Sequence, residues 1–263
     1  MDTVDITTSG SLAVVTLQRG KVNAVNGDLV DRLRAAFRDL EADPAIRSVI
    51  LTGRGSFFSF GLDVPELYDL PPDDFAAFLR NFTDLCRGLF LFPKPLVAAI
   101  NGHAIAGGCI LATACDRRVM ATGKPRISLN ELTFGSTVFQ TAVELMRYWI
   151  GSRHAEEVLF GGRMYTAEEA RAIGLVDLAA APERPGPSVG NRSAASEFEA
   201  VAFGEAARLG EISPDAFAQA KSMLRRPVID LIVAREEATI KRFVEIWYTP
   251  EIRASLRRIT IRQ

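Results

Sequence analysis

The stretch "NGHAIAGGC" (101–109) places three glycines and two alanines, and no acidic residue, between two strongly apolar segments. The preceding "KPLVAAI" is typical of a buried strand, and the following "ILATACD" is typical of an apolar helix. Bare backbone between two buried elements usually means that another group must approach the main chain closely. The stretch therefore predicts a strand, a glycine loop and a helix arranged around a point of close approach.

Strand-like and helix-like segments alternate through the first two thirds of the chain. Residues 11–19, 47–53, 94–102 and 115–122 have the β-branched or apolar content of strands. Helical spacing of apolar residues or helix boundaries mark the stretches after Asn26, at 73–92, from Val138 to Gly151, at 153–160 and at 167–173. This alternation predicts βαβ units and an α/β fold with a mainly parallel sheet.

Residues 180–196 contain three prolines and two glycines and form the one plausible linker. Beyond them, residues 197–263 have the pattern of helices without strands. We therefore expect a core at 1–196 and a helical region at 197–263.

Charge and composition exclude several classes of partner. The net charge is −1 without any long block of like charge, which argues against nucleic acid or an anionic membrane. The start "MDTVDITTSG" lacks the basic and apolar regions of a signal peptide, and no apolar run suits a membrane span. The three cysteines show neither metal spacing nor a disulfide framework. We expect a cytoplasmic protein with buried thiols.

Two loops are candidates for binding a ligand oxygen. Gly107 stands where a helix begins, so its amide lacks an internal partner and carries the positive end of the helix dipole. In "GRGSFFSFGLDVPEL" (53–67), Leu62 precedes a helix-start signature at Asp63. Loops at the carboxyl ends of parallel strands converge, so one amide from each would form an oxyanion hole. Taken singly, each loop also fits a tight turn that binds nothing.

Glu131 lies in an otherwise uncharged run from Ser128 to Val143. If it is buried beside Phe134, Val138 and Phe139, its pKa should rise toward neutrality and suit a general base. The alternative is a solvated loop glutamate.

Other polar residues are weaker candidates. His103 and His154 lack partners at a recognisable spacing, and Ser59 lacks the context of a nucleophile elbow. Glu144 falls roughly 120° from the apolar helix stripe, which predicts an exposed side chain.

Two segments, "FFSFGLDVPEL" and "KPLVAAINGHAIAGGCILATACDRRVMA", resemble the crotonase family, also called the enoyl-CoA hydratase/isomerase superfamily. "RMYTAEEARAIGLVD" (163–177) is similar to a later helix-turn segment of that family. The resemblance implies an α/β, ClpP-like spiral core of ββα repeats with a C-terminal helical trimerisation region. It further implies a homotrimer, or a dimer of trimers, that acts on acyl-CoA without a separate cofactor.

The acidic residues indicate which branch of this family the chain resembles. Family hydratases carry one glutamate shortly after the glycine pair, where this chain has Ile110, and a second that corresponds to Glu131. The local sequences "FSFGLD", "AGGCIL" and "LNELTFG" are most similar to those of the mitochondrial-type Δ3,Δ2-enoyl-CoA isomerases. The alternatives are a hydratase, a hydrolase or decarboxylase, and a non-catalytic acyl-CoA-binding homologue.

The resemblance assigns roles by position. Glu131 would be the catalytic acid/base, and the backbone amides of Leu62 and Gly107 the oxyanion hole. The residues implied at the CoA are Lys21, Asn23, Ala24, Ser59, Phe60 and Gly61, and those of the acyl pocket are Leu67, Ile110, Phe134 and Val138. Lys21 and Arg54 would contact CoA phosphates or remain solvated charges.

Some positions depart from the family pattern. Phe60 replaces a small residue, His103 is an uncommon choice, and "STVFQT" lacks a proline found in many isomerases. Phe139 stands where dienoyl isomerases place an acid. These departures concern the identity of the substrate more than the class of reaction.

Overall fold

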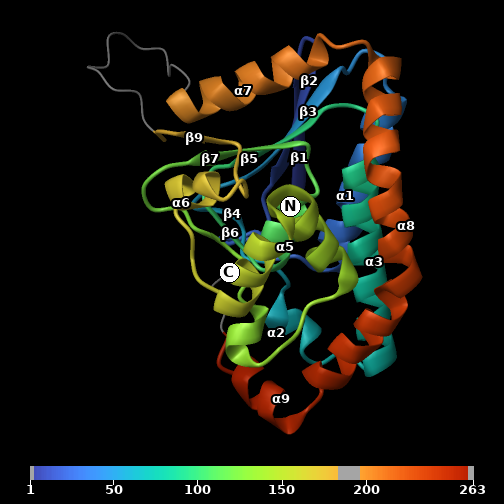
Figure 1. Ribbon diagram of the computed structural model, residues 1–263, viewed down its shortest axis with the longest axis vertical. Helices are drawn as coiled ribbons and strands as arrows, with labels where there is room; N and C mark the ends of the chain where they lie inside the picture. The colour runs from blue at the N-terminus through green and yellow to red at the C-terminus, as the bar shows by residue number, and fades with distance from the viewer. Residues whose placement is uncertain (1–2, 183–195, 260–263) are drawn as a thin grey trace.

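The structure, a computed structural model, describes residues 3–182 and 196–259, so most of the predicted linker at 180–196 lies outside the described residues. Figure 1 shows the arrangement of the elements. In chain order they are β1 (Val4–Ser9), β2 (Leu12–Leu17), α1 (Gly27–Ala42), β3 (Ser48–Gly53), β4 (Phe57–Ser59), α2 (Val64–Leu67), α3 (Pro72–Leu91), β5 (Leu96–Ile100), β6 (His103–Ile105), α4 (Gly107–Thr113), β7 (Arg117–Ala121), β8 (Ile127–Ser128), the 3₁₀ turn η1 (Glu131–Phe134), α5 (Gln140–Gly161), α6 (Ala167–Ala172), β9 (Leu178–Ala180), α7 (Glu197–Gly210), α8 (Pro214–Trp247) and α9 (Pro250–Leu256).

The strands form two sheets. The larger has the order β1-β2-β3-β5-β7-β9, and only β1 runs antiparallel to its neighbour. The smaller contains β4, β6 and β8, all parallel. The predicted α/β fold with a mainly parallel sheet is confirmed.

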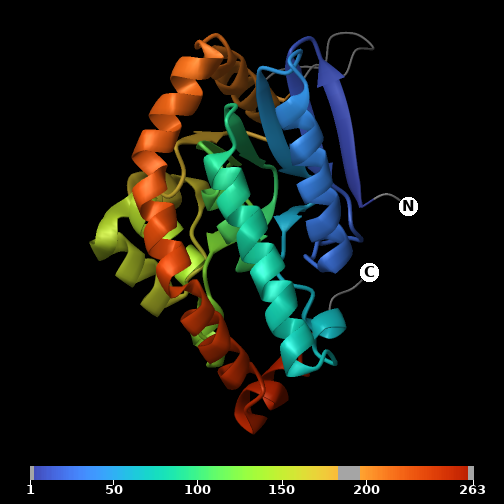
Figure 2. The same ribbon diagram turned by 90° about the vertical axis from the view of Figure 1, so that its right-hand side faces the viewer.

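The larger sheet is covered on both faces, as alternation along its strands requires. In β3, Val49 and Leu51 face the main core with α1 and α3, whereas Ile50 faces a second cluster with α7. Figures 1 and 2 show α7 lying across the sheet, while α1, α3 and α8 run side by side. No helix among residues 3–182 and 196–259 has both the length and the apolar character to cross a membrane.

A buried carboxylate joins α8 to the core. Lys221 Nζ lies 2.7 Å and Arg225 Nη1 2.8 Å from Asp116 Oδ1, between α4 and β7. Asp116 Oδ2 also accepts a hydrogen bond from the Leu96 amide in β5. All three charged side chains are buried, so the pairing offsets the cost of removing them from water.

The structure corrects some local expectations. Glu144 is buried rather than exposed, and its Oε1 accepts hydrogen bonds from Gln140 and Arg147. Helical periodicity missed this because it treats a polar residue off the apolar stripe as solvated. Gly151, with φ 70° and ψ 167°, breaks α5 into two helical parts, as expected. The three cysteines are buried free thiols, also as expected.

Candidate functional site

The orientation of the Leu62 amide follows from a parallel bridge between Leu62 and Val25. The Val25 amide donates to the Gly61 carbonyl at 2.7 Å, and the Asp63 amide donates to the Val25 carbonyl at 2.8 Å. In a parallel pairing, the groups on either side of a residue point to the partner, and its own amide points away. The Leu62 N–H therefore points away from the segment of Val25.

Gly107, the first residue of α4, lies close to that amide. A Cβ atom on Gly107 would lie 3.4 Å from Leu62 N, and one on Gly61 would lie 2.9 Å from Gly107 N. Neither the Leu62 nor the Gly107 amide donates a hydrogen bond to any residue of the described chain. Two neighbouring free N–H groups can bind one oxygen that carries negative charge.

The glycines permit this approach of two loops. Gly61 has φ +97°, a conformation that side chains disfavour, and a Cβ there would meet Ile105 O at 2.8 Å. A Cβ on Gly108 would lie 2.2 Å from Ser59 O. Ala106 holds φ 51° without being glycine, which is a costly conformation next to the candidate site. The bare backbone of 101–109 therefore accommodates the other loop.

Glu131 begins the 3₁₀ turn η1, and its side chain is buried. Its Oε2 makes no hydrogen bond with the described residues. Burial raises the pKa of the Glu131 carboxyl to about 7, although the backbone amides of Asn130 and Glu131 act in the opposite direction. The predicted burial is confirmed, and the alternative of a solvated loop glutamate is wrong. Such a carboxyl can both accept and return a proton at neutral pH.

A cavity of about 350 Å³ brings these groups together. Glu131, Leu62 and Gly107 all line it, and so do three residues predicted near the ligand, Phe60, Ile110 and Phe134. The remaining lining residues are mostly apolar or small and come from distant parts of the chain: Val64, Phe82, Ile105, Ala106, Asn130, Ser136, Phe139, Met164, Phe243, Trp247, Ser255, Arg258 and Ile259. The cavity therefore suits an apolar chain next to a group that carries negative charge.

Two predicted pocket residues do not line this cavity. Leu67 is buried in the main core, and Val138 packs against that core from its edge. Leu67 lies on α2 and packs into the core, and Val138 precedes α5.

Most of the residues predicted at the CoA are buried and hold the loops together. Asn23 Nδ2 donates to the carbonyls of Arg54 and Phe57, and Ser59 Oγ donates to Asn23 O at 2.8 Å. Ala24 and Gly61 are buried as well, so chiefly backbone groups remain for a ligand. Lys21 and Arg54 are exposed. Contact of any of these residues with CoA stays a prediction.

The C-terminal wall of the cavity was not predicted. Phe243 and Trp247 come from α8, and Ser255, Arg258 and Ile259 come from α9 and the residues after it. Phe82, Phe139, Phe243 and Trp247 form a chain of ring contacts with centroids about 6 Å apart. In the sequence, these aromatic residues are indistinguishable from ordinary core residues of a helix. His103 does not line the cavity and instead contacts the ring of Phe57.

The fold and these paired loops define a protein of the crotonase type. The chain belongs to the enoyl-CoA hydratase/isomerase family, whose sequence pattern matches residues 7–259. Mitochondrial enoyl-CoA delta isomerase 1 of Mus musculus is 33% identical over 248 residues, which cover 93% of this chain and 81% of that protein. A short-chain-enoyl-CoA hydratase of Clostridium acetobutylicum is 32% identical over 69% of this chain and 70% of its own length.

Among solved structures, the human mitochondrial delta3-delta2-enoyl-CoA isomerase superposes with a TM-score of 0.87 at 28% identity. The match covers 97% of this chain and 96% of that one. The expected crotonase fold, with its C-terminal helical region, is therefore confirmed.

Proposed function

We propose that this protein is a Δ3,Δ2-enoyl-CoA isomerase that moves the double bond of a 3-enoyl-CoA to the 2-trans position. The observation that carries the proposal is a single carboxyl in the cavity. Among the described residues that line it, Glu131 is the one acid, and the position of the second glutamate of family hydratases holds Ile110, which is buried and apolar. Isomerisation needs one group that removes a proton and returns it, whereas hydration also needs a group that manages water.

The proposed reaction uses these groups in turn. The thioester oxygen accepts hydrogen bonds from the Leu62 and Gly107 amides, which acidifies the protons on C2. Glu131 removes a C2 proton, and the electron pair spreads over a dienolate whose charge rests on the bound oxygen. The protonated Glu131 then delivers the proton to C4, and the double bond lies between C2 and C3. Loss of one such oxyanion donor costs about 3–4 kcal/mol of barrier.

The alternatives share the same oxyanion site. Relatives named hydratase keep that reaction as the second candidate, but Ile110 offers no group to orient water. A hydrolase and a non-catalytic acyl-CoA-binding protein also fit the cavity, and the perturbed carboxyl of Glu131 argues against the latter.

An assay with purified protein separates these reactions. A 3-enoyl-CoA and a 2-enoyl-CoA are supplied separately, and the absorbance of the conjugated thioester is followed together with release of free thiol. We expect turnover of the 3-enoyl-CoA alone, and its loss in Glu131→Gln with acyl-CoA binding retained. Glu144→Gln, which changes a buried glutamate outside the cavity lining, serves as the control and should keep activity. Wild-type rates in Glu131→Gln would refute the proposed role.

We also propose that the chain forms a homotrimer or a dimer of trimers. Met223, Leu224 and Val233 on α8 are large apolar side chains with 70%, 66% and 59% exposure, which supports burial against other subunits. Light scattering coupled to size exclusion should give three or six times the chain mass of 28.7 kDa, and a monomer at micromolar concentration would contradict the proposal.

A further inference from the structure

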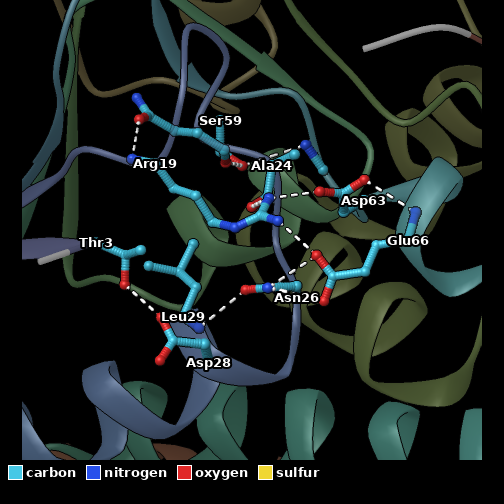
Figure 3. A network of polar contacts seen from close by, with 11 residues as sticks. Thr3, Arg19, Ala24, Asn26, Asp28, Leu29, Ser59, Asp63 and Glu66 are labelled. Carbon is cyan, nitrogen blue, oxygen red and sulfur yellow. Dashed lines mark hydrogen bonds and ion pairs between the residues drawn. The ribbon is translucent and has the colours of Figure 1, made fainter. Parts of the chain in front are cut away.

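Arg19, just after β2, has a guanidinium group that contacts three residues in two separate segments (Figure 3). Its Nη1 donates to Ala24 O at 3.0 Å and to Asp63 Oδ2 at 2.5 Å, and its Nη2 donates to Glu66 Oε2 at 2.6 Å. The Arg19 side chain is only 17% exposed and that of Asp63 only 6%. The Arg19–Asp63 pair is therefore built into the fold and is little screened by solvent, whereas the Glu66 side chain is 49% exposed.

The contacts of Arg19 lie on both sides of the bridge that orients the Leu62 amide. Ala24 directly precedes Val25, the bridge partner of Leu62, and Asp63 directly follows Leu62. A single planar group thus holds the two strands of this bridge together. The guanidinium has directed donors on separate nitrogens, which the ammonium group of lysine cannot reproduce.

Four further hydrogen bonds extend the network into α1 and α2. Asp63 Oδ1 accepts a hydrogen bond from the Glu66 amide and caps α2, which begins immediately after the loop. Asn26 Nδ2 donates to the Glu66 carboxylate at 2.9 and 3.0 Å, while Asn26 Oδ1 caps α1 at the Leu29 amide (Figure 3). The segment directly after Leu62 is therefore held by both Arg19 and Asn26.

The charge of Asp63 gives a second reason why Arg19 should affect the oxygen bound at the Leu62 amide. The Asp63 carboxylate is buried one residue from an amide that, in the proposed reaction, binds an oxygen as it becomes negative. Without a counter-ion this carboxylate would oppose that charge. The guanidinium of Arg19, which Asp63 shares with the more exposed Glu66, offsets this charge.

We infer that Arg19 is a positioning residue for the proposed isomerisation, holding the Leu62 amide in place and compensating Asp63. This inference rests on the proposed function. It predicts that Arg19 acts on the polarised thioester and much less on binding of the ground state, because Arg19 does not line the cavity.

The test compares Arg19→Met and Arg19→Lys with Arg80→Met. Arg80 forms an exposed two-bond pair with Glu237, so its substitution also removes an arginine–carboxylate pair, but on the surface of α3. For Arg19→Met we expect kcat to fall about 10- to 100-fold, with affinity for a saturated acyl-CoA within about threefold of wild type. The kcat of Arg19→Lys should lie between those of wild type and Arg19→Met. Added guanidinium ion should partly restore the kcat of Arg19→Met. Arg80→Met should keep kcat.

A spectroscopic measurement makes the test independent of turnover. In a Glu131→Gln background, a bound aryl-enoyl-CoA should show a red-shifted absorbance, because the two amides polarise its carbonyl. The shift should shrink with Arg19→Met and persist with Arg80→Met. If the protein isomerises nothing but this shift depends on Arg19, the proposed reaction fails and the positioning role stands. An unchanged shift and kcat in folded Arg19→Met, or equal losses in Arg80→Met, would overturn the inference.

Discussion

Glu131 should make the fold less stable at high pH, and Glu131→Gln should remove this effect. The folded pKa is about 7, above the ordinary 4.5, because the buried carboxyl resists ionisation. The folded state therefore holds the proton more tightly than the unfolded chain does. The resulting stabilisation is fully present below the unfolded pKa of about 4.5 and is lost as pH rises through about 7.

The difference between these pKa values, at 1.36 kcal/mol per pH unit, corresponds to about 3 kcal/mol. We expect the free energy of unfolding of Glu131→Gln, relative to wild type, to rise by about that amount between about pH 4.5 and about pH 8.5. Urea unfolding at fixed protein concentration measures it, since subunit association would otherwise shift the midpoint. Glu237→Gln is the control, because the pKa of this exposed glutamate is lowered by Arg80. A difference that does not change with pH, or that falls as pH rises, would refute the assigned burial.

Three other outcomes can be checked. In steady-state kinetics, kcat/KM for a 3-enoyl-CoA should rise with pH and reach half its maximum near pH 7, where Glu131 ionises; a flat profile would contradict its role as base. Gly108→Ala would place a Cβ 2.2 Å from Ser59 O, so the loops must separate, and we expect thermal unfolding at lower temperature together with weaker activity. Asp116→Ala leaves Lys221 and Arg225 buried without their counter-ion, so the free energy of unfolding measured by chemical denaturation should fall by about 3–5 kcal/mol. A loss below about 1 kcal/mol would contradict that pairing.

Much of the core could be predicted because local chemistry decided it. The strands at 11–19, 47–53 and 94–102 have strongly apolar sequences, and each lies in the larger sheet. Gly61 could be singled out because a side chain there would meet the backbone of the other loop, and Gly107 because it begins a helix. The uncharged run around Glu131 suggested a raised pKa only on condition that the side chain was buried, and that burial came from the fold.

The missed features depend on tertiary contacts. β1, β4, β6 and β9 are short or strongly exposed, and their partners decide that they are strands. The cavity wall from Phe243 to Ile259 lies far from Glu131 in the chain, and no local pattern connects the two. Arg19 escaped notice because one arginine after a strand is common, and its meaning depends on carboxylates 44 and 47 positions away.

The ion pairs of Asp116 with Lys221 and Arg225 hold α8 near one end, whereas Trp247 lines the cavity near the other end. From Lys221 to Trp247, α8 makes 26 residue steps, or about 39 Å at a rise of 1.5 Å per step. A tilt of only about 1° at these ion pairs would move the Trp247 ring by about 0.7 Å along this lever. We therefore expect substitutions around this remote pivot to change the shape of the cavity wall and, in the proposed reaction, the acyl chains that fit it.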